Sequence, residues 1–276
     1  MATVQVRDTT LYYEWSGSGP ELLFIHGMCG HAGVWDGQVQ RLADRFTCIT
    51  YDRRGHSRST SPTQRESVAT HAADAAALIE ALGLDRPVLV GSSGGARIAV
   101  ELTRTRPELL SGAVFSEPPI FSLEPAAGRA VQAEIAAVVR PAAEAGGPRA
   151  AVDAFFAVVC PGLWSALDEP ARDRYRANGH MMLAEFAGEP YELDPTDVAT
   201  IDLPALVISG TDSHPALQAI AATLASALPD ARFVQLAGSG HVTYAERPDE
   251  FASAVREFAT DVIPRTAGTR GRPLLA

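Results

Sequence analysis

The sequence of 276 residues contains no lysine, because all 23 of its basic residues are arginine. The absence of lysine excludes Schiff-base chemistry and the phosphate-binding loop that requires a lysine. Acidic residues outnumber basic ones by 33 to 23, which gives a formal net charge of -10. A surface this negative repels phosphate backbones and anionic lipids, so we expect neither nucleic acid nor a membrane as a partner.

Cysteine and long apolar runs are scarce as well. The three cysteines, Cys29, Cys48 and Cys160, are odd in number and widely spaced, unlike a disulfide framework or a zinc cluster. Residues 1–10 are polar and charged where a signal peptide needs an apolar run, and no stretch approaches the roughly 18 apolar residues of a membrane-spanning helix. We therefore predict a soluble, cytoplasmic protein without a bound metal.

Hydrophobic residues, in contrast, make up 46% of the chain and are enough for a sizeable core. They fall into alternating strand-like and helix-like segments. Strands are predicted at residues 11–15, 22–26, 46–51, 87–91 and 112–115, and helices at residues 34–43, 68–82 and 96–105. This alternation is typical of a doubly wound, mostly parallel α/β sheet with helices on both faces.

The alternation stops at about residue 120 and resumes at about residue 200. The stretch between is rich in alanine and helical in pattern, which predicts a helical cap inserted after the sixth strand, over the ends of the strands. Beyond it, strands are predicted at 205–209 and 232–236 and helices at 216–228 and 249–259. We therefore divide the chain into a first part of the core (1–119), a cap (120–200), a second part of the core (201–264) and a flexible tail (265–276).

The strongest chemical signal is the run Gly91-Ser92-Ser93-Gly94-Gly95, between a predicted strand and a predicted helix. A G-x-S-x-G turn in this context holds its central serine in a strained conformation, exposed above the sheet. Only Ser93 has glycine both two residues before and two residues after it. Taken alone, the run is equally compatible with a nucleophile and with a Gly/Ser turn that has no chemical role. Its position between a strand and a helix predicts Ser93 as a nucleophile.

A serine hydroxyl needs a base to become nucleophilic. Among the seven histidines, His241 stands just after the last predicted strand and before the final helix. Such a loop lies at the carboxyl edge of the sheet, as Ser93 does, so we predict His241 as the base. A surface or packing role is the alternative for an isolated loop histidine, whereas the chain order serine, acid, histidine favours a catalytic triad.

Acyl transfer also needs backbone donors for the negative oxygen of the tetrahedral intermediate. Residues 24–28 end a predicted strand and enter a glycine-rich loop, which suits this role. We predict the backbone amides of Met28 and Gly94 as the two donors, and a structural role for His26. The spacing of His26, His31 and His56 does not match a metal site.

Together these motifs resemble the α/β-hydrolase family over roughly residues 11–259. The resemblance includes the His26-Gly27 loop, the turn at residues 51–57, the serine elbow, the cap and the Gly-x-Gly-His241 loop. It implies hydrolysis through an acyl-enzyme, with no cofactor. Serine at the elbow disfavours epoxide hydrolysis and dehalogenation, because family members with those activities attack with aspartate.

The resemblance leaves two candidates for the triad acid. Family members commonly place it in a Gly-x-x-Asp turn, but here that turn has Ser213 at the expected position and Asp212 one residue early. Other members place the acid after the preceding strand, where this chain has Glu117 followed by two prolines. Prolines would fix a carboxylate well for orienting the imidazole, so we favour Glu117, with Asp212 as the alternative.

The elbow serines and the Glu-Pro turn are similar to those of lactonases that open the macrocyclic ester of zearalenone. Residues 12–14, 17–20 and 57–59 are also similar to that group, whereas residues 26–28 depart from its Pro-Asp-Gly-like stretch. The resemblance implies a small hydrophobic ester or lactone as substrate.

The cap is expected to supply the substrate pocket. Trp164, which follows a Pro-Gly break, is the preferred substrate contact, although aromatic residues at helical spacing are more often plain core. Rival functions are a cofactor-free haloperoxidase or perhydrolase and a C–C bond hydrolase with the same triad. A binding protein that retains the fold without turnover is the non-enzymatic alternative.

Overall fold

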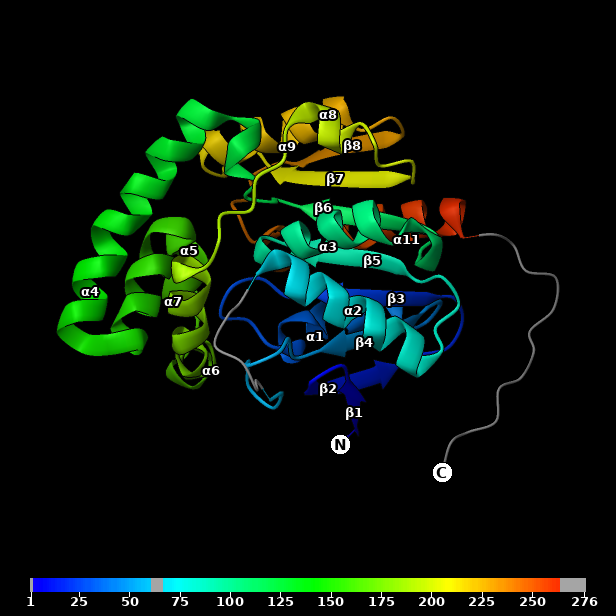
Figure 1. Ribbon diagram of the computed structural model, residues 1–276, viewed down its shortest axis with the longest axis horizontal. Helices are drawn as coiled ribbons and strands as arrows, with labels where there is room; N and C mark the ends of the chain where they lie inside the picture. The colour runs from blue at the N-terminus through cyan, green and yellow to red at the C-terminus, as the bar shows by residue number, and fades with distance from the viewer. Residues whose placement is uncertain (1, 61–66, 264–276) are drawn as a thin grey trace.

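The described residues, 2–60 and 67–263 of a computed structural model, form one eight-stranded sheet with helices on both faces (Figure 1). The order of the strands is β1-β2-β4-β3-β5-β6-β7-β8. Their bounds are β1 Ala2–Val6, β2 Thr9–Ser16, β3 Glu21–Ile25, β4 Thr47–Tyr51, β5 Val88–Ser92, β6 Gly112–Ser116, β7 Ala205–Gly210 and β8 Ala231–Leu236. The β1–β2 and β2–β4 pairs are antiparallel and the others parallel, which confirms the predicted fold class.

Alternate residues of the central strands enter two separate cores, because both faces of the sheet are covered. The helices against the sheet are α1 Asp36–Leu42, α2 Val68–Leu82, α3 Gly94–Thr105, α9 Pro215–Ala227 and α11 Pro248–Val262, with the short helices η1 Ala32–Trp35, η2 Pro107–Leu109 and α10 Thr243–Glu246. Leu23 and Ile25 of β3 pack in the core that includes α2, α3 and α9, whereas Leu22 and Phe24 pack in the core that includes α1 and α11.

Between β6 and β7 the chain leaves the sheet and forms η3 Phe121–Leu123, α4 Pro125–Val159, α5 Pro161–Ala166, α6 Glu169–Ala177, α7 Gly179–Ala187 and α8 Pro195–Val198. We call α4 to α7 the cap helices; they lie together beyond one end of the strands (Figure 1). Gly147, with φ 70° and ψ -164°, interrupts α4. The division of the chain into domains stays a prediction, and the predicted tail (265–276) lies outside the described residues.

The structure adds one strand that the sequence analysis left out. β1 pairs with β2 from Ala2↔Tyr13 to Val6↔Thr9. The three cysteines are buried and unpaired. Among the residues that the structure describes, no helix is long and apolar enough to cross a membrane. The cytoplasmic location stays a prediction.

Candidate active site

Ser93 occupies the sharp turn between β5 and α3. Its backbone has φ 54° and ψ -122°, a region that residues with a side chain rarely adopt, and its amide donates to Ser116 O at 2.9 Å. Glycine is required on both sides of this turn. A Cβ on Gly91 would lie 2.6 Å from Gly95 O, and one on Gly95 would lie 2.1 Å from Ile25 O. The tight approach of the backbone thus raises Ser93 above the edge of the sheet.

His241 lies on the loop between β8 and α10, next to Ser93. Its Nε2 is 2.9 Å from Ser93 Oγ, and its Nδ1 is 3.3 Å from Glu117 Oε2. An ionised carboxylate only accepts hydrogen bonds, so Nδ1 carries the proton and Nε2 is free to accept one from the serine hydroxyl. The three side chains therefore form one hydrogen-bonded line from Glu117 to Ser93.

Glu117 follows β6 and is completely buried, with a backbone φ of 51°. Besides His241, it accepts hydrogen bonds from Ser209 Oγ at 2.6 Å, Gly210 N at 2.9 Å and Ser213 Oγ at 2.5 Å. Burial raises the pKa of this carboxyl, but its hydrogen bond and attraction to His241 and the two serine hydroxyls outweigh burial, so the pKa is lowered overall. Glu117 is therefore held as a carboxylate.

The turn after β7 contains Asp212, the alternative candidate for the triad acid, but it contacts the triad through Ser213. Asp212 is exposed, and its carboxylate accepts a hydrogen bond from Thr211 Oγ1. Ser213, at the position where family members commonly carry the acid, instead donates to Glu117. Among the described residues, the carboxylate that contacts His241 is that of Glu117. Ser209 and Ser213 were not predicted from the sequence as partners of Glu117.

The two predicted oxyanion donors lie together beside Ser93. Gly94 begins α3, and a Cβ on Gly94 would be 3.4 Å from Met28 N. The loop before Met28 also passes close to Ser93: a Cβ on Gly27 would be 3.2 Å from Ser93 Cβ. The structure thus brings the Met28 and Gly94 backbones to the same side of the serine.

An apolar cavity opens above Ser93 and His241. Its walls come in equal parts from the core and from the cap segment, which contributes Phe155, Phe156 and Trp164 among others. Trp164 is buried and stacks on Phe156, with ring centroids 4.7 Å apart and planes 10° apart. The predicted substrate contact therefore lines the cavity and also packs within the cap.

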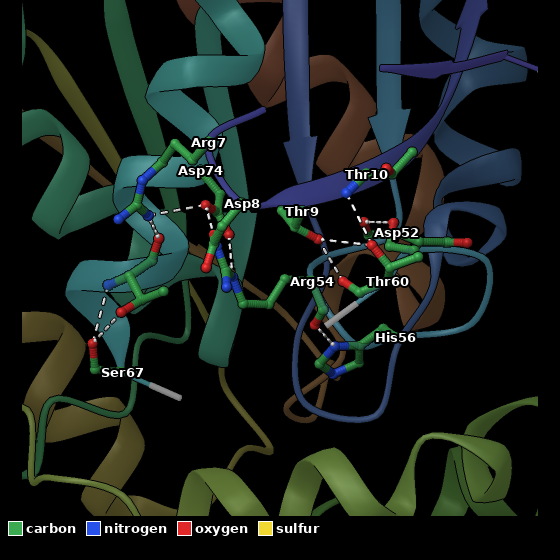
Figure 2. Close-up of polar contacts among 12 residues, drawn as sticks. Arg7, Asp8, Thr9, Thr10, Asp52, Arg54, His56, Thr60, Ser67 and Asp74 are labelled. Carbon is green, nitrogen blue, oxygen red and sulfur yellow. Dashed lines mark hydrogen bonds and ion pairs between the residues drawn. The ribbon is translucent and has the colours of Figure 1, made fainter. Parts of the chain in front are cut away.

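The loop after β4 is held by buried polar contacts. Arg54 of this loop is buried and binds Asp74 of α2 through two hydrogen bonds of 2.6 and 2.8 Å and Asp8 through one of 2.7 Å (Figure 2). His56 Nδ1 lies 3.0 Å from the Arg54 carbonyl oxygen. These contacts fix the loop, whose turn at residues 51–57 is part of the family resemblance.

We expect the free energy of unfolding to fall as the pH is lowered from about 6.5 toward 5. His26, His31 and His56 are buried; burial lowers the pKa of all three, that of His31 to about 4. In this window the unfolded state binds more protons than the folded state. Each histidine that is protonated in the unfolded state and neutral in the folded state lowers the free energy of unfolding by about 1.4 kcal/mol per pH unit. Urea unfolding at pH 7.5, 6 and 5 measures the slope.

Replacing His31 by Gln is expected to reduce this slope relative to that of the wild-type protein. A free energy of unfolding that is constant between pH 7 and 5, or an equal slope in His31→Gln and the wild type, would contradict the assignment to buried histidines.

Comparison with known proteins agrees with this architecture. The family described as alpha/beta hydrolase fold matches residues 20–248, and the chain therefore belongs to that family. A non-heme chloroperoxidase of Streptomyces lividans is 31% identical over 230 residues, which cover 78% of this chain and 83% of that protein. The predicted family is thus confirmed, and the chain is a hydrolase by fold.

Two further proteins show how far the likeness extends. The uncharacterized hydrolase YraK of Bacillus subtilis is 37% identical over 123 residues, but the match spans only 44% of this chain and 45% of that protein. A solved structure described as "Est816 as an N-Acyl homoserine lactone degrading enzyme" is 26% identical, with a TM-score of 0.73 over 93% of this chain and all of that one. The particular resemblance to zearalenone lactonases stays a prediction.

Proposed function

We propose that this chain is a serine hydrolase that cleaves carboxylic esters or lactones through the triad Ser93, His241 and Glu117. The observation that carries the proposal is the hydrogen-bonded line from Glu117 through His241 to Ser93 Oγ. It ends beside the two backbone segments, at Met28 and Gly94, that would stabilise an oxyanion. The chemistry requires no cofactor.

In the first half of the reaction, His241 Nε2 takes the hydroxyl proton as Ser93 Oγ attacks the carbonyl carbon. Glu117 holds the proton on Nδ1 and stabilises the imidazolium. The Met28 and Gly94 amides bind the oxyanion, and each such donor typically contributes about 3–4 kcal/mol to the transition state. His241 then protonates the leaving alcohol oxygen, which leaves an acyl group on Ser93.

In the second half, His241 takes a proton from water as the water oxygen attacks the acyl carbon. A second tetrahedral intermediate binds in the same oxyanion hole. It collapses to the carboxylic acid product, and the proton on His241 returns to Ser93 Oγ.

The cavity supports a hydrophobic substrate, since the cap covers Ser93 with Phe155, Phe156 and Trp164. The similarity to Est816, whose title names a lactone-degrading enzyme, supports a lactone among the substrates to test. From the elbow and the Glu-Pro turn, we propose the macrolactone zearalenone as the first specific candidate.

Trp164→Ala is expected to raise the KM of a large hydrophobic ester several-fold and to leave the kcat of a small activated ester nearly unchanged. The reason is that Trp164 lines the cavity but lies on a cap helix, apart from the triad. Steady-state kinetics on both esters measure the difference, with Val138→Ala, at an exposed position of α4, as the control. Equal losses on both esters would show that the cap had misfolded.

A second candidate function is perhydrolysis, in which hydrogen peroxide replaces water in attacking the acyl-enzyme. The observation that favours it is the 31% identity to a non-heme chloroperoxidase. Formation of a peracid from a short carboxylic acid and peroxide would distinguish this activity from ester hydrolysis.

The test of the proposed function is a substrate panel followed by labelling. The protein is incubated with zearalenone, with p-nitrophenyl esters of increasing chain length, and with acetate plus hydrogen peroxide, and products are identified by chromatography. A fluorophosphonate should label Ser93, which peptide mass spectrometry would locate. Turnover of esters with labelling at Ser93 supports the proposal, while labelling without turnover of any ester or lactone would overturn it.

A further inference from the structure

We propose that the cap helix α7 completes the oxyanion hole, with Glu185 acting through Arg53 and with Asn178 holding the adjoining loop. All three are positioning residues, since none of them reaches the reacting atoms. The inference rests on the proposed function and assigns to the cap a part in stabilising the transition state, beyond its part in forming the pocket.

The starting point is the Gly27–Met28 peptide group, whose amide is a predicted oxyanion donor. Its carbonyl, Gly27 O, lies 3.2 Å from Gly30 N, 2.9 Å from His26 Nδ1 and 3.3 Å from Arg53 Nη2. In a trans peptide the carbonyl and the N–H point in opposite directions, so donors that fix the carbonyl also fix the direction of the Met28 N–H. Hydrogen bonds to the carbonyl also polarise the peptide and strengthen its N–H as a donor.

The protonation of His26 follows from its own contacts. The Arg53 backbone amide donates to His26 Nε2 at 3.0 Å. Burial, followed by the Arg53 charge, lowers the pKa of His26, so the ring is neutral and has a single acceptor nitrogen. The proton is therefore on Nδ1, from which His26 donates to Gly27 O.

Arg53 supplies the charged donor, and the cap holds it in place. Its side chain is 1% exposed, and Nη2 lies 2.7 Å from Glu185 Oε1 of α7. Burial raises the pKa of Glu185, but the positive charges around it, Arg53 first, lower the pKa overall, so the carboxylate is ionised. Arg97 Nη2 is only 3.7 Å from the other oxygen of this carboxylate. Without Glu185 the two guanidinium groups would repel each other, and Arg53 would lose its ionised partner, which leaves His56 Nε2, 3.1 Å from Nη2, as a neutral one.

Asn178, just before α7, holds the same loop at a second point. Its side chain is almost completely buried, and Nδ2 donates to Gly30 O at 2.8 Å and Cys29 O at 3.1 Å. Its Oδ1 accepts from Ser57 N at 2.8 Å. Residues at the start of α7 and near its end thus bind both core loops that carry the oxyanion peptide and Arg53.

The experiment compares Glu185→Ala, Glu185→Gln and Asn178→Ala with the wild-type protein. The readouts are kcat and KM for p-nitrophenyl acetate, and the inhibition constants of a trifluoromethyl ketone and of the matching secondary alcohol. Ser93 Oγ adds to the ketone carbon, its proton passes to His241, and the ketone oxygen becomes an oxyanion; the alcohol binds the pocket without forming this adduct. Only the ketone therefore depends on the oxyanion hole.

For Glu185→Ala we expect kcat to fall about 10- to 100-fold, a partial loss compared with removing a donor outright, and the affinity for the ketone to fall by a similar factor. KM and the affinity for the alcohol should stay within about threefold of the wild-type values, since the contacts that bind the ground state are not altered. Glu185→Gln keeps an acceptor oxygen for Arg53 but loses the charge that offsets the two guanidinium groups, so it should recover only part of the loss. Asn178→Ala should change the same two quantities in the same direction.

The matched control is Asp153→Asn, which removes an ion pair of 2.9 Å between Asp153 and Arg176 inside the cap. It should change neither inhibitor. If Glu185→Ala does not fold, the double variant Arg53→Met with Glu185→Leu removes both charges of the pair and tests the same contact.

Folded variants with wild-type kcat and ketone affinity would overturn the inference, and so would equal losses for the ketone and the alcohol. Those outcomes leave the proposed function intact, because the wild type would still hydrolyse the ester and bind the ketone. A wild type that does neither would overturn the proposed function and this inference with it.

Discussion

Ser93→Ala is expected to lower kcat for an ester about a million-fold, to the residual rate that binding and the oxyanion hole provide on their own. The serine oxygen forms the acyl bond, and among the described residues it is the hydroxyl that lies within hydrogen-bond distance of His241 Nε2, at 2.9 Å. The substitution removes only the hydroxyl oxygen and keeps the Cβ and the backbone of the elbow, so the fold should be kept. Steady-state kinetics with an activated ester and circular dichroism measure the two properties.

Ser92→Ala is the matched control, because Ser92 is the neighbouring serine of the same elbow at the end of β5. Its kcat should stay within about threefold of the wild type, as for a residue that makes no bond in the transition state. Substantial ester turnover by Ser93→Ala would mean that the reaction does not pass through an acyl group on Ser93.

Glu117→Gln is expected to lower kcat about ten-thousand-fold, because a neutral amide no longer holds His241 in the tautomer that accepts the serine proton. Gln has nearly the shape of Glu. With its oxygen in the place of Oε1 it still accepts from Ser209, while its NH2 group, in the place of Oε2, faces His241 Nδ1 and Ser213 Oγ and can only donate. The measurement is kcat for a small activated ester, accompanied by thermal unfolding.

Asp212→Asn distinguishes the two candidate acids, since Asp212 is exposed and is bonded to Thr211. Its kcat should remain near the wild-type value. A large loss in Asp212→Asn together with a small one in Glu117→Gln would reverse the assignment of the acid.

Most of the fold could be predicted from the sequence because the central strands are buried on both faces and therefore form short continuous apolar runs. β1 was missed for the opposite reason. It lies at the edge of the sheet and alternates partly buried with exposed residues, and its first residues, Ala2 to Gln5, carry little apolar surface. The alternation of Val4, Gln5 and Val6 is a period-two pattern that indicates a half-buried strand, but it was not used because residues 1–10 were interpreted as polar and charged.

The site residues likewise divide into those that a local motif predicts and those that only the fold brings together. Ser93 and His241 were predictable because each stands in a local motif whose glycines and position on the sheet define its geometry. The choice of acid depends on which strand end reaches His241, a question of three-dimensional distance, so Glu117 and Asp212 both remained open. The partners of Arg53 were out of reach, because Glu185 lies 132 residues away in the chain.

Cap segments are attractive units for engineering, since exchanging them between related proteins offers a direct way to reshape a pocket. Here the units are not equivalent. α5 carries the wall residue Trp164, whereas α7 is joined to two core loops by Asn178 and Glu185. A transplanted cap would have to retain these two side chains at their present positions, and α5, which carries Trp164, is the part to vary first.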